Sequence, residues 1–332
     1  MFLRNKLTSK HLAYKLLILL LFLIPSFAVS QTNTEKDTTY VHTFQDKITT
    51  RVGFINSTYA FNLSDKQSNA SLKIKPNQET SVAFSILFRS IELDFGFTPK
   101  FFPGNDDDEE KGDTEKLTFN FRMFLGQWMQ TIDFNRAKGF YIQDNSNKNV
   151  VALLPDFKVN TIGGTTSYIF NKNFSFRAIG FQNEWQKRSA GSFIPSLSYY
   201  YHTFRSKEYG MHNNYSLDIA VGPGYYYNSI LDKNFIISAG SNLGIGINKT
   251  KNSYETITST LYQSIIRTTL GYNSETFFTG YNGNVSIYKY DQKSDINFND
   301  SIYFFEFYLG YRFKAPKKWI DKVDAFNKKA GL

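Results

Sequence analysis

One regularity limits how this chain can fold: between residues 47 and 313, apolar and polar side chains alternate with a period of two. Over 91–98, apolar side chains occupy the odd positions and polar or small ones the even positions, and the pattern recurs at 117–123, 235–248 and 303–313. Successive side chains of a β-strand point to opposite faces, so this alternation predicts half-buried strands. No stretch of comparable length has a convincing helical period. The sequence therefore predicts an all-β fold.

The apolar face of these strands is unusually rich in aromatic side chains. Water-soluble cores rely mainly on Leu, Ile and Val, whereas this chain has 33 Phe and 22 Tyr. Phe suits a face that meets lipid, and Tyr199–Tyr201 and Tyr225–Tyr227 suit the headgroup girdles, where a ring has one dry and one wet end. The chain has no Cys, which excludes a disulfide framework, a Cys-ligated metal and a thiol nucleophile.

Tight turns test the strand prediction, because a slip of one residue would send every side chain to the wrong face. We place five tight turns at Arg89–Ser90, Gly126–Gln127, 171–173, 231–233 and Asn273–Ser274. These turns would align Phe88 with Ile91, Leu125 with Trp128, Phe170 with Phe174 and Leu270 with Phe277. They alternate with longer polar connections at 64–79, 99–115 and 137–157. Alternating short turns and long loops are typical of an outer-membrane barrel and are not required of a soluble sandwich.

The expected architecture is a transmembrane antiparallel up-and-down β-barrel of about twelve strands. Thirteen candidate strands can be counted, but a barrel with both ends of the chain on one side needs an even number. The conflict lies in 173–205, where the apolar phase slips from even to odd positions. We expect a bulge or inserted segment at Gln186–Ser192 that folds inward and constricts the lumen. Gly222-Pro223-Gly224 predicts a bend in a strand.

The first thirty residues have the pattern of a secretory signal peptide. A basic lead of four cations precedes an apolar run at 16–24, and Ala28-Val29-Ser30 predicts cleavage before Gln31. Nine apolar residues are too few to span a bilayer, for which about 20 are needed. The expected domains are a signal peptide at 1–30, a periplasmic segment at 31–46, the barrel at 47–313 and a Lys-rich periplasmic tail at 314–332. Export points to the outer membrane of a Gram-negative cell.

The net charge and the last predicted strand indicate which partners the protein has. Removing the signal lowers the net charge from +9 to about +5, which is no nucleic-acid footprint. We expect outer-membrane lipids as partners and no nucleic acid. Gly310–Phe313 resembles the terminal strand signature that the barrel-assembly machinery recognises.

In the tail, Trp319, Val323 and Phe326 fit one face of a short helix, with a solvated extension as the alternative.

Charged residues on the polar face are the one constellation that points to a site. We predict that they line the lumen: Glu92, Asp94, Arg122, Asp133, Arg177, Asp218, Arg267, Glu306 and Arg312. Arg122 lies diagonal to Asp133 in the predicted register. Two interpretations remain open, a polar pore or small-solute pocket and an internal ion-pair network that keeps the lumen narrow. A selective pore usually has an excess of one sign, which this set lacks.

Other motifs carry little chemistry. The acidic run that begins at Asp106 and ends at Asp113 is interpreted as a solvated loop tip, with a cation site as the alternative. After the signal the chain has His42 before the first strand, His202 near a strand end and His212 in a loop. No catalytic or metal-binding motif surrounds them, so no catalytic residue, cofactor or metal is predicted. A surface or girdle histidine is the expected role, and His202 or His212 beside a Ser is the alternative.

Several short motifs resemble an uncharacterised outer-membrane family of the Bacteroidetes, the domain-of-unknown-function family numbered 4421. They are Asp37–Tyr40, Asp46–Thr49 with Arg51, Lys75–Asn77, Glu184–Lys187, Ser189–Ser192 and Gly310–Phe313. The resemblance covers nearly all of the chain after the signal. It implies a single outer-membrane barrel and brings no known activity or catalytic residue.

The sequence thus favours a non-enzymatic integral outer-membrane barrel that acts as a narrow channel or as a structural component of the envelope. One alternative is a lipid-modifying enzyme, a hydrolase or acyltransferase, built into the barrel. Another is a surface adhesin that acts through its extracellular loops. The sequence names no solute, lipid or binding partner.

Overall fold

A computed structural model describes residues 38–65, 71–77, 80–102, 105, 108–179, 184–208, 211–252, 255–291 and 296–330. The predicted signal peptide and residues 31–37 lie outside these ranges, as do Asp106 and Asp107 of the acidic run. The chain divides into a strand unit that ends at Ala315 and a second unit that contains the C-terminal helix α3, Lys317–Ala330. None of the described helices is long and apolar enough to cross a membrane.

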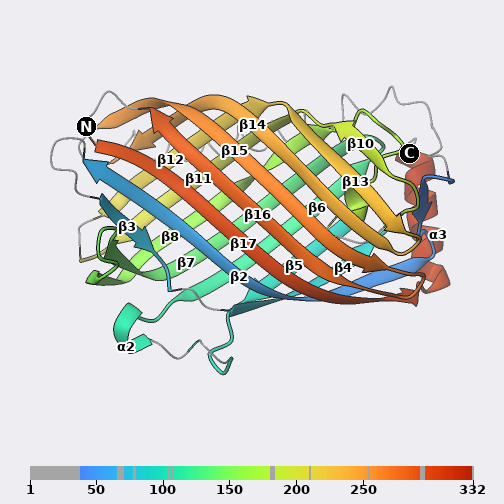
Figure 1. Ribbon diagram of the computed structural model, residues 1–332, viewed down its shortest axis with the longest axis horizontal. Helices are drawn as coiled ribbons and strands as arrows, with labels where there is room; N and C mark the ends of the chain where they lie inside the picture. The colour runs from blue at the N-terminus through green and yellow to red at the C-terminus, as the bar shows by residue number, and fades with distance from the viewer. Residues whose placement is uncertain are drawn as a thin grey trace, which may run out of the picture. The chain divides into compact units, whose positions relative to one another are not determined.

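The strand unit is a closed antiparallel barrel (Figure 1). Its ring runs in the order β14-β12-β11-β8-β7-β6-β5-β4-β2-β17-β16-β15 and closes through a pairing of β14 with β15. These twelve strands are β2 (Lys47–Asp65), β4 (Thr80–Phe88), β5 (Ile91–Phe97), β6 (Glu115–Leu125), β7 (Trp128–Asp144), β8 (Val150–Tyr168), β11 (Ser196–Ser206), β12 (Met211–Gly222), β14 (Phe235–Lys251), β15 (Thr256–Asn273), β16 (Phe277–Asp291) and β17 (Ile296–Lys314). The prediction of a twelve-stranded barrel is confirmed.

Three shorter strands complete the wall. β10 (Ala190–Phe193) and β13 (Gly224–Asp232) continue β11 and β12, and they pair with each other. Pro223 separates β12 from β13, but both pair with β14 in one continuous register, so the bend stays a prediction. β3 (Ser71–Lys75) bridges β2 and β7 beyond the ends of β4, β5 and β6. We call the end with the tight turns the short-turn end and the opposite end the loop end.

The predicted registers at two turns are confirmed. Phe88 pairs with Ile91, and Leu125 pairs with Trp128. The predicted turn at 231–233 is also tight, since Asp232 pairs with Phe235. The register at Asn273–Ser274 is wrong by four residues, because Leu270 pairs with Tyr281 rather than Phe277. An even shift keeps every side chain on its face, so the alternation cannot reveal it.

The predicted turn at 171–173 is wrong in a different way. Phe170 donates its backbone N–H to Phe193 O, so β8 meets the segment that contains β10 and β11. Phe174 and Phe176 do not pair with β8, because they are buried in an apolar cluster with side chains of several wall strands. Residues after Asn171 therefore leave the wall, and the wall resumes at Ala190.

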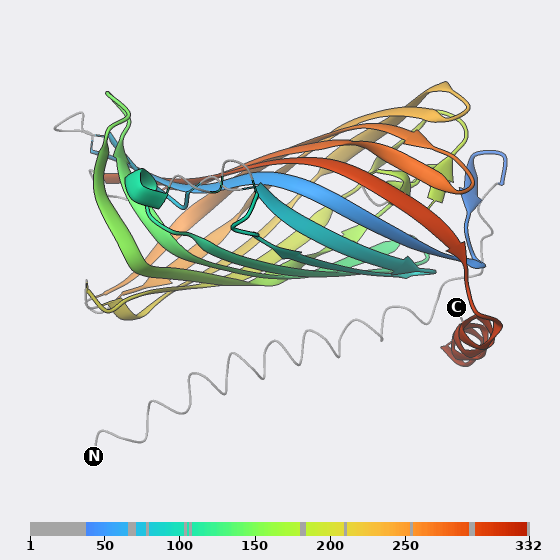
Figure 2. The same cartoon turned by 90° about the horizontal axis from the view of Figure 1, so that it is seen from below.

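The outer face of the ring is apolar. Its exposed side chains include Phe84, Phe119, Ile162, Ile247 and Phe305, which come from β4, β6, β8, β14 and β17 and so from strands all around the ring, which Figure 2 shows from below. A water-soluble monomer rarely exposes so large an apolar surface, whereas an outward apolar band is typical of membrane barrels. The Tyr clusters divide between faces. Tyr225 and Tyr227 are exposed, but Tyr226 is buried inside, so the expectation that whole clusters sit at the girdle is wrong.

A charge on this band should be costly. Phe305 lies midway along β17 with 61% of its surface exposed. We expect Phe305→Arg to lower the free energy of unfolding in phosphatidylcholine vesicles by about 2–4 kcal/mol, since Arg at mid-bilayer depth must lose its hydration. Urea unfolding measures the change. Phe305→Leu is the control and should stay close to the unchanged chain, and equal stability of the Arg and Leu variants would argue against a lipid-facing band.

The loop between β5 and β6 contains a short helix. α2 (Asp108–Lys111) contains part of the acidic run, and Asp113 forms an ion pair with Lys100. Among the described residues, no group of three His, Asp or Glu side chains is placed to hold a metal ion. His212 lies in β12 and not in a loop as predicted. α3 is a helix of 14 residues, which favours the helical interpretation of the tail.

Candidate functional site in the barrel lumen

The segment that leaves the wall after Phe170 fills the short-turn end of the lumen. We call residues 171–179 and 184–189 the plug. It contains the 3₁₀ helix η2 (Phe176–Ala178) and β9 (Glu184–Gln186). β9 pairs with β1 (Val41–Thr43), which precedes the barrel. The sequence predicted an inward fold at Gln186–Ser192. The structure places Gln186 in it but puts Ser192 in the wall strand β10.

Apolar packing fixes the plug inside the ring. Phe174, Phe176 and Ile179 of the plug form one buried cluster with wall residues of β4, β6, β7 and β13, which are Leu87, Phe124, Met129 and Tyr226. β4 and β13 lie on opposite sides of the ring, so a cluster that joins them must cross the lumen. The plug therefore closes the short-turn end with side chains rather than with wall backbone.

Gln186 is the hydrogen-bonding centre of the plug and is 1% exposed. Its Oε1 accepts from Ser175 N at 2.8 Å and from Asn228 Nδ2 of β13 at 3.2 Å. Its Nε2 donates to Tyr40 O at 3.3 Å and Asn173 O at 2.7 Å. One side chain thus joins the plug to the wall and to the segment before the barrel.

Two predicted lumen cations lie at this end. Arg177 is in the plug, where its guanidinium lies 3.3 Å from Glu184 and 4.4 Å from the centre of the Phe124 ring. Burial lowers the pKa of Arg177, although Glu184 opposes this. Arg312 donates to Ser274 O at 2.6 Å and lies over the Phe44 ring at 3.9 Å. Arg177 therefore helps to hold the plug, whereas Arg312 joins β17 to the turn between β15 and β16 and to Phe44 before the barrel.

The mouth beside Arg312 carries a small ion-pair group. Glu275 accepts from Lys47 Nζ at 2.9 Å and lies 3.5 Å from His42 Nε2. Burial would raise the pKa of Glu275, but the Lys47 hydrogen bond and the His42 charge hold it below its usual value. Burial lowers the pKa of His42 despite Glu275. These contacts tie β1 to the turn between β15 and β16.

Four other predicted residues meet Arg51 in one network, which we call the arginine network: Arg51, Glu92, Asp94, Arg122 and Glu306. Arg122 Nη1 lies 3.1 Å from Glu92 Oε1 and 2.5 Å from Asp94 Oδ2. Arg51 lies 3.5 Å from both Asp94 and Glu306. All five side chains are at least 83% shielded from solvent. Arg51 is absent from the predicted set of lumen residues, although it lies on the same alternating face.

Asp133 and Arg267 lie apart from this network. Asp133 accepts from Tyr200 Oη at 3.0 Å, so its hydrogen-bond partner is a tyrosine rather than the Arg122 that the predicted register suggested. Arg267 lines the same lumen cavity as Asp133. Among the described residues it has no hydrogen-bond or ion-pair partner within contact distance.

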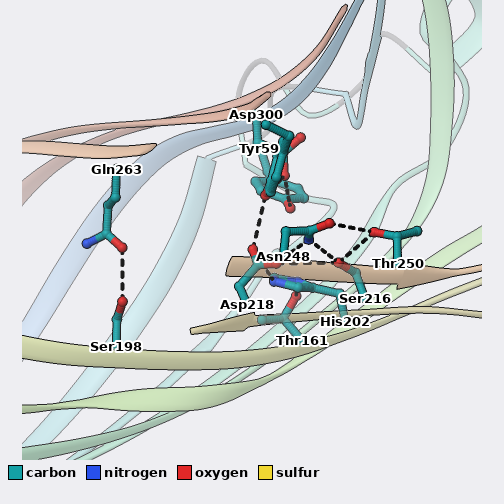
Figure 3. Close-up of polar contacts among 11 residues, drawn as sticks. Tyr59, Thr161, Ser198, His202, Ser216, Asp218, Asn248, Thr250, Gln263 and Asp300 are labelled. Carbon is teal, nitrogen blue, oxygen red and sulfur yellow. Dashed lines mark hydrogen bonds and ion pairs between the residues drawn. The ribbon is translucent and has the colours of Figure 1, made fainter. Parts of the chain in front are cut away.

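The second polar group surrounds His202 and is drawn in Figure 3. His202 Nδ1 lies 2.9 Å from Thr161 Oγ1, and His202 Nε2 lies 3.6 Å from Asp218 Oδ2. Tyr290 Oη lies 3.0 Å from Asp218 and 3.1 Å from Asp300. His202 is therefore an interior residue, and the expected surface or girdle role is wrong.

Further hydrogen bonds orient Asp218 and Asp300. Tyr59 Oη donates to Asp300 Oδ2 at 3.1 Å. Asp218 Oδ1 accepts from Ser216 Oγ at 3.4 Å and from the Asn248 amide. We call Thr161, His202, Asp218, Tyr290 and Asp300 the histidine cluster. Of these, the sequence analysis placed only Asp218 in the lumen. Asp300 lies on the same face as Glu306, six residues along β17, so the alternation could have placed Asp300 in the lumen as well.

The two polar groups line one cavity of about 450 Å³. Toward the short-turn end it stops at Phe176 and Ile179 of the plug. Toward the loop end an apolar cluster crosses the lumen, with the Phe61 ring 5.7 Å from that of Phe204 and 6.4 Å from that of Phe140. The lining also reaches Lys116 beside the ends of β5 and β6. The lumen is thus a polar chamber that the plug closes at one end and that an apolar cluster narrows at the other.

Solved structures similar to this chain are outer-membrane barrels. The COG4313 outer membrane channel from Pseudomonas putida F1 has 9% identity and a TM-score of 0.39, with 85% of this chain and 100% of that chain covered. The translocator domain of autotransporter NalP from Neisseria meningitidis has 10% identity and a TM-score of 0.39, with 92% and 98% covered. The outer membrane protease OmpT from Escherichia coli has 11% identity and a TM-score of 0.36, with 81% and 98% covered. These likenesses are too distant to assign an activity.

No curated protein matches the chain. The ring of twelve strands with an apolar outer face is the architecture of an integral outer-membrane β-barrel. The family described as "Domain of unknown function (DUF4421)" matches residues 35–313, which confirms the resemblance found in the motifs. A match over that length includes every strand of the ring except the last residue of β17. The chain therefore belongs to the DUF4421 family.

Proposed function

We propose that this protein is an outer-membrane channel for small polar solutes that is gated by its internal plug. The observation that carries the proposal is the polar chamber of about 450 Å³, which ends at a segment separate from the wall. A purely structural barrel has no need of a polar cavity, whereas a permanently open pore has no plug. A chamber stopped by a movable segment fits a channel that opens on demand.

The wall remains closed without the plug. Phe170 N donates to Phe193 O, and Tyr168 N donates to Pro195 O, so the backbone pairing bypasses residues 171–189. Asn171 Nδ2 also donates to Gly191 O at 2.7 Å, so the two ends of the plug lie together. The plug can therefore move as a loop without breaking the ring.

The chamber favours solutes without a strong net charge. Its inward-facing charged residues are five acids and four Lys or Arg side chains, which are Asp94, Asp133, Asp218, Asp300, Glu306, Arg51, Lys116, Arg122 and Arg267. Selective ion pores use an excess of one sign, so a balanced lining gives little charge selectivity. Export by the predicted signal peptide, residence in the outer membrane and insertion by the barrel-assembly machinery belong to the same proposal.

Loosening the plug should open the channel. Gln186→Leu keeps the side-chain volume but removes its hydrogen bonds to Ser175, Asn228 and Tyr40. Each such bond contributes about 1 kcal/mol, so loss of several should raise the open fraction at least about tenfold. Single-channel current in planar bilayers measures this fraction.

Gln127→Leu is the matched control. Gln127 lies at the same end, but its amide bonds only wall residues, donating to Ile169 O at 2.7 Å and Phe170 O at 3.1 Å. We expect it to leave the open fraction unchanged. Equal currents from the two variants, both folded, would reject gating by the plug.

The histidine cluster supports a second candidate function, acyl transfer. Thr161 Oγ1 lies within hydrogen-bond distance of His202 Nδ1, and Asp218 lies on the opposite ring nitrogen. This is the order of nucleophile, base and orienting acid in hydrolases. The His202–Asp218 distance of 3.6 Å is longer than a hydrogen bond, and the nucleophile would be a threonine.

Phospholipid hydrolysis tests this candidate. Purified barrel is mixed with phosphatidylethanolamine micelles, and released fatty acid is measured. An enzyme would lose release by about 10²-fold or more in Thr161→Val and His202→Ala. Absence of release, or release that both variants retain, would reject the acyl-transfer candidate.

A further inference from the structure

Three cations lie side by side on neighbouring wall strands near the loop end. Lys138 of β7 is the direct register partner of Lys158 of β8, and Lys158 is the direct partner of Arg205 of β11. We call these three residues the basic row. Like charges placed directly opposite each other destabilise a sheet. A row of three therefore needs a compensating anion or a strong reason to exist.

The basic row faces outward. Val159 and Phe204 are adjacent in sequence to Lys158 and Arg205, and both belong to the apolar cluster inside the loop end. Because successive strand side chains point to opposite faces, Lys158 and Arg205 project from the outer surface. Lys138 shares this face, since its register partner is Lys158.

An apolar surface begins four residues along β8 from Lys158, beyond an intervening layer of Arg136, Asn160 and Thr203. On the same face and toward the short-turn end, Ile162 pairs with Phe134 and with Tyr201. Ile162 is an exposed large hydrophobic residue of the outer band. The row therefore lies on the loop side of these apolar residues, where the headgroup of an outer-leaflet lipid would lie above its acyl chains.

The protein compensates this charge only in part. Glu115 pairs with Lys138 at 3.3 Å, but the two side chains are 58% and 41% exposed. Asp156, two residues before Lys158, accepts from Ser206 Oγ and from the backbone N–H groups of Lys207 and Glu208. Arg136 adds a fourth cation beside Lys158. Glu115 also acts on Lys158 electrostatically, but among the described residues no carboxylate lies within ion-pair distance of Lys158 or Arg205.

We propose that the basic row binds the phosphate of a lipid headgroup in the outer leaflet. Lys and Arg side chains supply the charge-assisted hydrogen bonds that phosphate oxygens accept. The acyl chains of the same lipid would lie on Phe134, Ile162 and Tyr201 below. The proposed lipid site depends on the proposed outer-membrane location but not on gating by the plug. A barrel that conducts no current could therefore still bind the lipid.

Binding of a phosphorylated lipid tests the site. The probe is bisphosphorylated lipid A, added to the full chain in dodecyl maltoside and measured by native mass spectrometry. Each basic residue near a charged lipid contributes enough to change affinity severalfold, so Lys158→Gln with Arg205→Gln should weaken binding by about tenfold. The same lipid without its phosphates should bind the unchanged chain as weakly as lipid A binds the double variant.

Lys249→Gln with Lys251→Gln is the matched control. These lysines lie on the same outer face of β14 near the loop end, but their register partners are Leu217 and Tyr215. The control should keep its affinity. Folding of each variant is checked by the heat-dependent gel shift of barrels, and without lipid the row variant should resist urea as well as the unchanged chain. Equal losses in both variants, or undiminished binding of the phosphate-free lipid, would overturn the proposal.

Discussion

Replacing residues 172–189 by a short Gly-Ser linker is expected to turn a mostly closed barrel into one that conducts steadily. The chamber stops at Phe176 and Ile179, and both are removed by this change. The linker is easily closed, because Asn171 and Gly191 are already hydrogen-bonded. Barrels of eight strands are filled by side chains and those of sixteen carry water, so an emptied ring of twelve should raise conductance on the order of tenfold or more.

Planar-bilayer recording measures this effect against a matched replacement. The same linker in place of residues 145–148 changes an exposed turn at the loop end and should leave the current unchanged. A plug-deleted barrel that folds but stays silent would mean that the apolar cluster around Phe61 and Phe204 closes the lumen instead. That result would contradict gating by the plug.

Removing Arg122 is the second change with a large expected effect. Arg122 is the close cation for both Glu92 and Asp94, which are 1% and 7% exposed. Arg122→Met leaves two carboxylates facing each other in the lumen with less compensation. Breaking a buried ion pair from one side costs about 3–5 kcal/mol. Urea unfolding of the barrel in detergent should show a loss of this size.

Neutralising the acids should restore much of the loss. In the triple variant that joins Arg122→Met to Glu92→Gln and Asp94→Asn, no uncompensated charge remains, so stability should approach that of the unchanged chain. If Arg122→Met alone is as stable as the triple variant, the arginine network does not stabilise the lumen. The alternative role of the network would then be to contact ions that pass through the lumen.

The sequence was sufficient for the barrel because lipid outside and polar groups inside impose the same alternation on each strand. It predicted the registers at Arg89–Ser90 and Gly126–Gln127, where short turns leave one solution. The register after Asn273 escaped it, because a shift of four residues keeps both faces intact. Strand alternation determines whether a residue faces the lumen or the lipid, but it only weakly determines the position of that residue along the barrel axis.

The plug was harder to derive from the sequence. A break in phase located it near Gln186, but its full extent depends on contacts with wall residues distant in sequence, such as Leu87 and Tyr226. The contacts of His202 were missed for the same reason. Whether an inward-facing residue meets a partner across the lumen depends on how the strands tilt and stagger around the closed ring, which no local pattern records.

Thiol accessibility tests the central claim, that the plug closes a polar chamber, most directly. The natural chain has no Cys, so Asn120→Cys places one thiol in the chamber wall. The barrel is reconstituted in vesicles, and a membrane-impermeant maleimide is added on the side of the short turns. Ser146→Cys at an exposed loop, labelled from the opposite side, reports orientation and folding. The account predicts that the thiol introduced in place of Asn120 is protected in the full chain and reactive once residues 172–189 are replaced, whereas equally fast labelling in both would contradict it.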